Sequence, residues 1–145
     1  MEPYPHRYSA TAHGDSEGEV TLCGKDLPSL DSAPPEQFGG PGDKWSPETL
    51  LVAAVADCFI LSFRGIARAS KFAWLSLECE VEGTLDRIDK TTQFTEMLVR
   101  ASLLVPRESD QDRARRLLER AEHSCLITQS LKAQRRLEAD IKVAS

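Results

Sequence analysis

The chain has 145 residues and a formal net charge of −5, with 41% hydrophobic and 28% charged residues. This length suits a single domain spanning residues 1–145 and allows a hydrophobic core without disulfides or metals as staples. The acidic balance argues against a general affinity for nucleic acid, because that affinity depends on neutralising phosphates. Composition thus indicates an ordinary globular protein that does not bind nucleic acid.

Neither an export signal nor a membrane span is predicted. Residues 1–18 contain no apolar stretch of the length that a signal peptide requires. The longest apolar run, Leu50–Phe63, includes Asp57 and is shorter than the roughly 20 residues that a membrane span needs. We therefore expect a cytoplasmic protein that does not enter a membrane.

The first third of the chain predicts a short β-hairpin followed by a loop. Strand-like residues lie around Tyr8–Ala12 and Glu19–Cys23, separated by the turn-rich HGDSEG. The loop PPEQFGGPGDKW follows, and it is long enough to be functional.

A central helix is predicted to begin at WSPETLL, with Ser46 as the N-cap and Pro47 at the first helical position. Glu48 then lies in the first turn, where an acid complements the helix dipole. The apolar residues that follow cover nearly every face of the helix, which predicts that it is buried.

The second half of the chain predicts a hairpin, a helix and a last strand. Residues 75–85 alternate apolar and acidic side chains, and a second alternation runs from Met97 to Val105 after the turn material RIDKTTQ. A helix with Ser109 as its cap follows, with an apolar stripe formed by Ala114, Leu117, Leu118 and Ala121. A strand from Leu137 to Val143 completes an α+β fold.

Four cysteines, at positions 23, 58, 79 and 125, are too far apart for a CxxC metal or redox motif. His123 and Cys125 have no second ligand pair nearby, so neither a metal nor a cofactor is expected. By position alone, Cys58 is either a small hydrophobe of the core or a reactive thiol. Cys79 occupies the apolar face of a strand and fits a structural role. Cys125 lies at a helix end among polar residues, and its role stays open.

Two stretches together resemble the family of osmotically inducible protein C (OsmC) and the organic hydroperoxide resistance proteins. They are PPEQFGGPGDKWSPETLLVAAVADCF and LLERAEHSCLITQSL, and LECEVEGTLDR fits the strand between them. The resemblance implies an OsmC-like α+β fold, with antiparallel sheets, a buried central helix and a second helix, assembled as an intertwined homodimer.

The same resemblance implies a thiol peroxidase for organic hydroperoxides. Cys58 would be the peroxidatic thiol, and Cys125 would resolve its sulfenic acid as an intramolecular disulfide. The reductant would be a small or lipoyl-type dithiol. Glu48 would help to organise the site. Because ten residues of helix span about 15 Å, Glu48 would reach Cys58 only from the partner subunit.

One departure from the family pattern favours a second hypothesis. The family peroxidases carry an arginine in the turn between the first two strands, whereas this turn reads HGDSEG. His13, Arg7, Arg64 and Arg68 are the candidate substitutes, and none is convincing from the sequence. The alternative is therefore a non-enzymatic homologue that binds a small apolar ligand or senses oxidants through its thiols.

Overall fold

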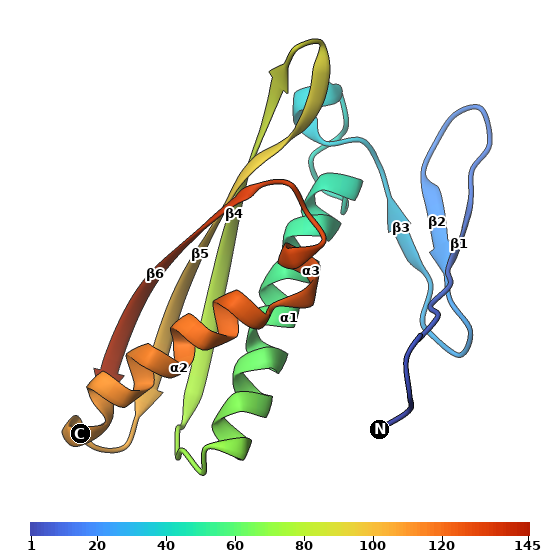
Figure 1. Ribbon diagram of the computed structural model, residues 1–145. Coiled ribbons are helices and arrows are strands. Elements are labelled where there is room, and N and C mark those ends of the chain that lie inside the picture. Colours follow the sequence, from blue (N-terminus) through green and yellow to red (C-terminus); the bar gives the residue numbers. More distant parts are fainter. The chain divides into compact units, whose positions relative to one another are not determined.

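The computed structural model describes residues 1–145, which form two compact units, residues 1–50 and residues 51–145. The first unit contains three strands, a 3-10 turn and the start of the long helix α1, and the second contains the rest of α1 and the other elements (Figure 1). In chain order the elements are β1 Thr11–His13, β2 Val20–Cys23, β3 Leu30–Ser32, η1 Glu36–Phe38, α1 Pro47–Ala69, β4 Ser76–Ile88, β5 Thr91–Val105, η2 Glu108–Asp110, α2 Gln111–Ser124, α3 Leu126–Gln129 and β6 Gln134–Val143.

Residues 1–50 form one small antiparallel sheet in the order β1-β2-β3. The predicted hairpin is present, with Thr11 opposite Cys23, but its first strand begins at Thr11 because the exposed Tyr8 has no strand partner. The third strand, β3, is not predicted by the sequence because three residues are too few to establish an alternation.

The start of α1 follows the predicted capping. The Ser46 hydroxyl accepts a hydrogen bond from the Thr49 amide at 3.1 Å, and the Thr49 hydroxyl accepts one from the Ser46 amide at 2.8 Å. This reciprocal pair satisfies two amides at the helix start, with threonine in the place where a capping box usually has Glu or Gln. The prediction of Ser46 as N-cap and Pro47 as first helical residue is confirmed.

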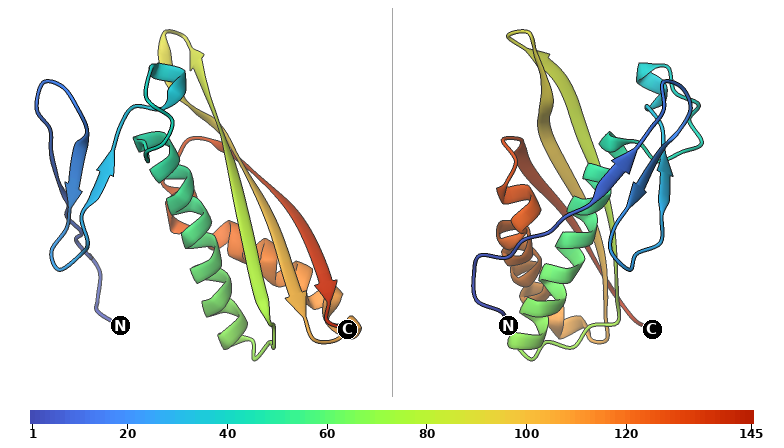
Figure 2. Two further views of the ribbon diagram at one scale, coloured as in Figure 1. Left: turned by 180° about the vertical axis from the view of Figure 1, so that it is seen from behind. Right: turned by 90° about the vertical axis from the view of Figure 1, so that its right-hand side faces the viewer.

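Residues 51–145 form a three-stranded sheet in the order β4-β5-β6 (Figure 2). The predicted hairpin is confirmed, since β4 and β5 pair antiparallel from Ser76 opposite Leu104 to Ile88 opposite Thr91. The expectation of purely antiparallel sheets needs correction, because β6 pairs parallel to β5. The reason is the connection through α2 and α3, which crosses back over the sheet before β6 begins.

The turn of the β4–β5 hairpin is tighter than the sequence indicates. Most of RIDKTTQ belongs to the two strands, and only Asp89 and Lys90 form the turn. Both have positive φ angles, 49° and 68°, as a two-residue hairpin turn requires.

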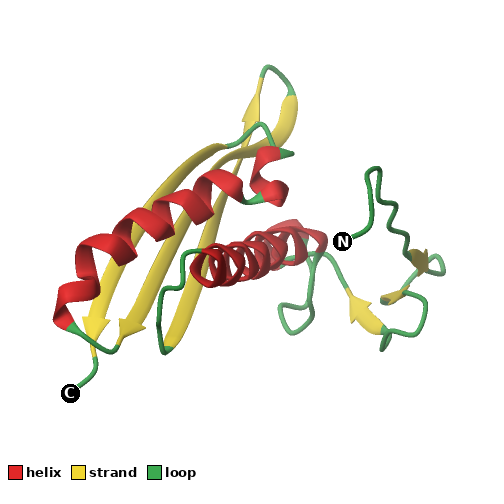
Figure 3. Cartoon of the chain, turned by 60° about the horizontal axis from the view of Figure 1, so that its bottom comes forward, coloured by secondary structure: helices red, strands yellow, loops and turns green.

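The hydrophobic core of this unit lies between one face of the sheet and the helices α1 and α2 (Figure 3). β5 contributes the predicted alternating set Met97, Val99, Ala101, Leu103 and Val105, all buried. The predicted stripe of α2, which includes Leu117 and Leu118, packs on the same core. At Gly83 a Cβ atom would meet Val52 of α1 at 2.8 Å, so this glycine lets the helix approach β4 closely.

Within the chain, α1 is buried on one face rather than all round. Its buried residues are Val55, Phe59, Phe63 and Ala67, whereas Leu61 on another face is 52% exposed. By length and composition α1 would also suffice to cross a membrane, but the core helix of a soluble protein meets the same criterion. Its packing against the core cluster of residues 51–145 agrees with the prediction of a core helix.

The end of the chain departs from the prediction in three places. Ser109 is not the cap of α2, because residues 108–110 form the turn η2 and Asp110 occupies the N-cap position. The short helix α3 was not predicted. β6 begins at Gln134 rather than Leu137, because its first residues extend the pairing with β5 although they are polar.

Candidate functional site

Cys58 lies at the middle of α1 and lines an open groove of about 460 Å³. The groove is formed mainly by apolar side chains from α1 and α3, namely Ala54, Leu61, Leu126 and Ile127, together with Asp57 and Ser62. The thiol is half-buried, and its sulfur lies 3.9 Å from the hydroxyl of Ser62, one helical turn further on. Cys58 is therefore accessible to a small molecule that enters the groove.

Cys125 occupies the junction between α2 and α3 and is only 1% exposed. It is the C-cap of α2, as its predicted position at the helix end implies. The hydroxyl of Thr128, also buried, donates a hydrogen bond to the Cys125 sulfur at 3.0 Å. Cys125 is thus held inside the protein by a polar partner on the next helical turn.

The two predicted thiols lie together within residues 51–145. Burial raises the pKa of the Cys125 thiol above its ordinary value, hydrogen bonding to Thr128 lowers it in part, and hydrogen bonding and charge interaction with Cys58 raise it further. Leu126 and Ile127, which directly follow Cys125, line the groove of Cys58. The geometry therefore places one accessible and one buried thiol next to each other.

The other two cysteines have different surroundings. Cys79 packs against the hydrophobic core from β4, and burial, with a smaller contribution from Cys125, raises the pKa of its thiol to about 12. A thiol with such a pKa stays protonated at neutral pH and is a poor nucleophile, which fits a structural role. Cys23 is exposed at the end of β2, in residues 1–50.

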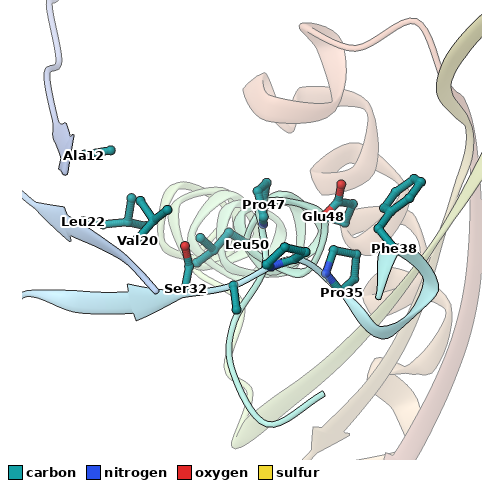
Figure 4. Close-up of a pocket in the computed structure, with 11 residues that line it drawn as sticks. Ala12, Val20, Leu22, Ser32, Pro35, Phe38, Pro47, Glu48 and Leu50 are labelled. Atoms are coloured by element: carbon teal, nitrogen blue, oxygen red, sulfur yellow. The ribbon is translucent and has the colours of Figure 1, made fainter. Parts of the chain in front are cut away.

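Glu48 lies within residues 1–50, at the edge of an apolar cavity of about 470 Å³. Figure 4 shows Val20, Leu22 and Leu50 on one side of this cavity and Glu48 with Phe38 on the other. The Oε1 atom of Glu48 is buried and has no hydrogen-bond partner within the chain. A buried carboxylate oxygen without a partner is unfavourable, so this atom is suited to a donor from outside the chain.

Of the candidate substitutes for the arginine that the resemblance implies, Arg7 and His13 belong to residues 1–50, and Arg64 and Arg68 belong to residues 51–145. His13 faces Asp15 at 3.5 Å in the turn between β1 and β2. Arg64 and Arg68 are exposed on α1, and neither lines the groove of Cys58. The charged side chain that does line this groove is Asp57.

No group of three or more His, Cys, Asp or Glu side chains gathers in a way that could hold a metal ion. Two contributors to the thiol site were not assigned a role from the sequence, Thr128 and Ser62. A signal for both exists in their spacing, because Thr128 follows Cys125 by three residues and Ser62 follows Cys58 by four. Residues three and four apart on a helix are neighbours, so each hydroxyl lies beside a sulfur.

Residues 40–140 match the family described as OsmC-like protein. A curated relative is the uncharacterized protein YmaD of Bacillus subtilis, which is 26% identical over 114 residues, or 75% of this chain and 76% of YmaD.

Solved structures of the same family share the fold. An OsmC-like protein of unknown function from Vibrio cholerae has a TM-score of 0.84 at 18% identity, over 93% of this chain and 99% of that chain. The organic hydroperoxide resistance protein OsmC from Legionella pneumophila has a TM-score of 0.73 at 24% identity, over 97% and 99%. An organic hydroperoxide resistance protein from Elizabethkingia anophelis has a TM-score of 0.76 at 16% identity, over 99% and 100%. These likenesses confirm the predicted OsmC-like α+β fold.

Proposed function

Because this chain belongs to the OsmC-like protein family, we propose that it is a thiol-dependent peroxidase that reduces organic hydroperoxides. The observation that carries the proposal is the pair formed by Cys58, which lines an open groove, and the buried Cys125 that interacts with it. Relatives of the same fold are named organic hydroperoxide resistance proteins.

The proposed oxidation proceeds in two steps. The Cys58 thiolate attacks the terminal oxygen of a hydroperoxide ROOH; the O–O bond breaks, Cys58 becomes a sulfenic acid, and the alkoxide takes a proton to leave as ROH. The Cys125 thiol then attacks the sulfenic sulfur, which forms the Cys58–Cys125 disulfide and releases water. The effect of Cys58 on the pKa of Cys125 places the two thiols near each other, which supports the second step.

The groove favours hydroperoxides with an apolar body. Its walls are mainly the aliphatic side chains of α1 and α3, of which Leu61 and Leu126 are 52% and 65% exposed. An alkyl or aryl group of the substrate would cover these side chains, whereas hydrogen peroxide has no apolar surface to bury. Asp57 at the same groove disfavours substrates with a negative charge close to the peroxide.

Glu48 is proposed to complete the site from the partner subunit of a homodimer. Within one helix it lies about 15 Å along the axis from Cys58, too far for contact. Its Oε1 atom is buried without a partner in its own chain. A second copy that brings its Cys58 region to the cavity of Glu48 would satisfy this oxygen and cover the exposed face of α1.

The cycle is closed by a reductant. We propose a dithiol, small or lipoyl-type, because a second thiol on the same molecule would release Cys58 from the mixed disulfide without another encounter. A reducing cytoplasm, the proposed location, would supply such a reductant.

The test is steady-state consumption of cumene hydroperoxide with dihydrolipoamide as reductant. Wild type should turn over, and Cys58→Ser should lose at least about 1000-fold in rate, because serine is not nucleophilic without an activating base. The matched control is Cys23→Ser, which removes an exposed thiol and should keep the wild-type rate. Consumption that persists in Cys58→Ser would contradict the proposal.

A second candidate function is the binding of a small apolar ligand without catalysis. It rests on the cavity within residues 1–50, whose lining is mainly apolar, and on the lack of an arginine in the turn between β1 and β2. A small molecule that is retained on purification, together with no dithiol-dependent turnover, would favour this function over the peroxidase.

A further inference from the structure

The hydrogen bond between Thr128 and Cys125 has no role in the oxidation steps described above. Both side chains are buried, at 3% and 1% exposure, and the Thr128 hydroxyl donates to the sulfur at 3.0 Å. The Gln129 amide donates to the Cys125 carbonyl at 3.0 Å, and this turn sets Thr128 beside the sulfur. The threonine hydroxyl is thus positioned by the backbone.

We propose that Thr128 is a positioning residue for the reductive half of the cycle: it stabilises Cys125 as the leaving thiolate, so that the reductant attacks Cys58. This inference rests on the proposed peroxidase function. In this assignment the reductant attacks the Cys58 sulfur, and Thr128 supports the departure of the Cys125 sulfur.

Access decides part of this assignment. Cys58 is half-buried and lines the open groove, whereas Cys125 is 1% exposed and does not line it. A thiolate that enters the groove therefore reaches the Cys58 sulfur first. The residues that follow Cys125, Leu126 and Ile127, line the groove, so a reductant that enters it meets their apolar side chains and not the buried Cys125 sulfur.

Thiolate stabilisation decides the rest. In thiol–disulfide exchange the thiol with the lower pKa leaves faster. Burial raises the pKa of Cys125, which slows its departure, and hydrogen bonding to Thr128 acts in the opposite direction. Because a hydrogen bond to an anion is stronger than one to a neutral sulfur, the hydroxyl stabilises the leaving thiolate more than the disulfide.

The reductive step then balances as follows. A reductant thiolate attacks the Cys58 sulfur, its S–S bond to Cys125 breaks, and the electron pair of that bond goes to Cys125, which takes up a proton afterwards. The second thiol of the reductant then attacks the first reductant sulfur in the mixed disulfide, which releases reduced Cys58 and leaves the reductant as a cyclic disulfide.

The experiment compares Thr128→Val, which keeps the shape and removes the hydroxyl, with Thr128→Ser, which keeps a donor. Each protein is oxidised to the Cys58–Cys125 disulfide with diamide, so that the test does not depend on hydroperoxide chemistry. Reduction of this disulfide by dihydrolipoamide is followed by stopped flow. In a separate measurement, oxidation of Cys58 by cumene hydroperoxide is followed by trapping its sulfenic acid with dimedone. The sulfur that is attacked is mapped by acid quench and mass spectrometry after glutathione is added to the oxidised wild type.

The expected result is reduction about tenfold slower in Thr128→Val, the scale of one hydrogen bond to a charged atom. Thr128→Ser should restore most of the rate, trapping of Cys58 should change less than about twofold, and glutathione should appear on Cys58. Three results would overturn the inference. They are equal slowing of disulfide reduction and Cys58 oxidation in Thr128→Val, a wild-type rate of disulfide reduction in Thr128→Val, and glutathione attached to Cys125. Failure of the peroxidase proposal would show instead as no oxidation by hydroperoxide in any variant.

Discussion

Residues 1–50 and residues 51–145 differ in how much of their structure they support by themselves. The strands of the first unit have three, four and three residues, and its buried side chains are Ser32, Ala33 and Ser46. The second unit has strands of 13, 15 and 10 residues and contains the hydrophobic core cluster. Small sheets of this kind need a partner surface for stability.

The chemistry is divided in the same way. The thiols Cys58 and Cys125 interact within residues 51–145, so that unit contains both members of the proposed redox pair. Residues 1–50 contain Glu48 with an unpartnered buried oxygen and an apolar cavity. Under the proposal made above, the disulfide forms within one chain, whereas Glu48 completes the site of Cys58 from a second copy.

The largest expected effect on stability comes from the core of residues 51–145. Phe63 of α1 is fully buried and packs against Trp74 with ring centroids 5.3 Å apart. Phe63→Ala should lower the free energy of unfolding by about 3–5 kcal/mol, because it leaves a cavity. The matched control in residues 1–50 is Phe38→Ala, which should change it by less than about 0.5 kcal/mol, since Phe38 is 60% exposed. Urea titrations measure both, and a comparable loss in the two variants would refute the contrast between the units.

Glu48→Gln sharpens the contrast in chemistry. The change keeps the shape but replaces one acceptor oxygen by an amide donor, so the hydrogen bond proposed for the Glu48 carboxylate across the dimer interface is lost. kcat/KM for cumene hydroperoxide should then fall about tenfold, equivalent to ~1.4 kcal/mol of transition-state stabilisation. Formation of the Cys58–Cys125 disulfide by diamide should keep its wild-type extent, because that pair lies in the other unit. The control is Glu36→Gln, which makes the same change at a glutamate of η1 that does not line the cavity of Glu48 and should keep the wild-type kcat/KM. Unchanged turnover in Glu48→Gln would show that Glu48 has no role in the reaction of Cys58.

Ser46→Ala tests the junction at which α1 begins. The Ser46 side chain accepts the Thr49 amide and is buried, so its removal leaves a helix-start amide without this partner. A loss of about 1 kcal/mol in the free energy of unfolding is expected, the usual value for an N-cap. Ser46→Thr should recover most of it, and a neutral Ser46→Ala would show that the cap does not stabilise α1.

The last prediction concerns stability at alkaline pH. The pKa of Cys79 is about 12 in the folded protein, against about 8.5 for an unfolded cysteine. Its contribution to stability is complete below about pH 8.5 and is lost progressively as the pH rises towards 12, because the unfolded chain loses this proton first. Unfolding free energies between pH 8 and 10.5 should therefore decline less steeply in Cys79→Ala than in wild type. Equal slopes would mean that Cys79 is not desolvated.

Much of the fold could be predicted because its signals are local and periodic. The alternation at Leu77, Cys79 and Val81 predicts β4, and Ser46 with Pro47 predicts the start of α1. Elements such as β3 and α3 could not be predicted, since three or four residues do not show a period. The parallel pairing of β6 depends on how the chain crosses the sheet, which residue patterns do not encode.

The candidate site was predictable only in part. Cys58 and Cys125 are identified by family resemblance, because position alone favours a buried hydrophobe at Cys58 and leaves the role of Cys125 open. The sequence contains Thr128 three residues after Cys125, but whether the hydroxyl faces the sulfur depends on the turn between α2 and α3. The lone carboxylate oxygen of Glu48 likewise depends on packing within residues 1–50.

The most direct test is the intact mass of the reduced protein after brief treatment with cumene hydroperoxide, followed by mapping of its thiols. The account predicts that each chain loses two hydrogens, that the disulfide joins Cys58 to Cys125, and that Cys23 and Cys79 stay free. Free thiols at both Cys58 and Cys125 after treatment would contradict it and would favour the ligand-binding function.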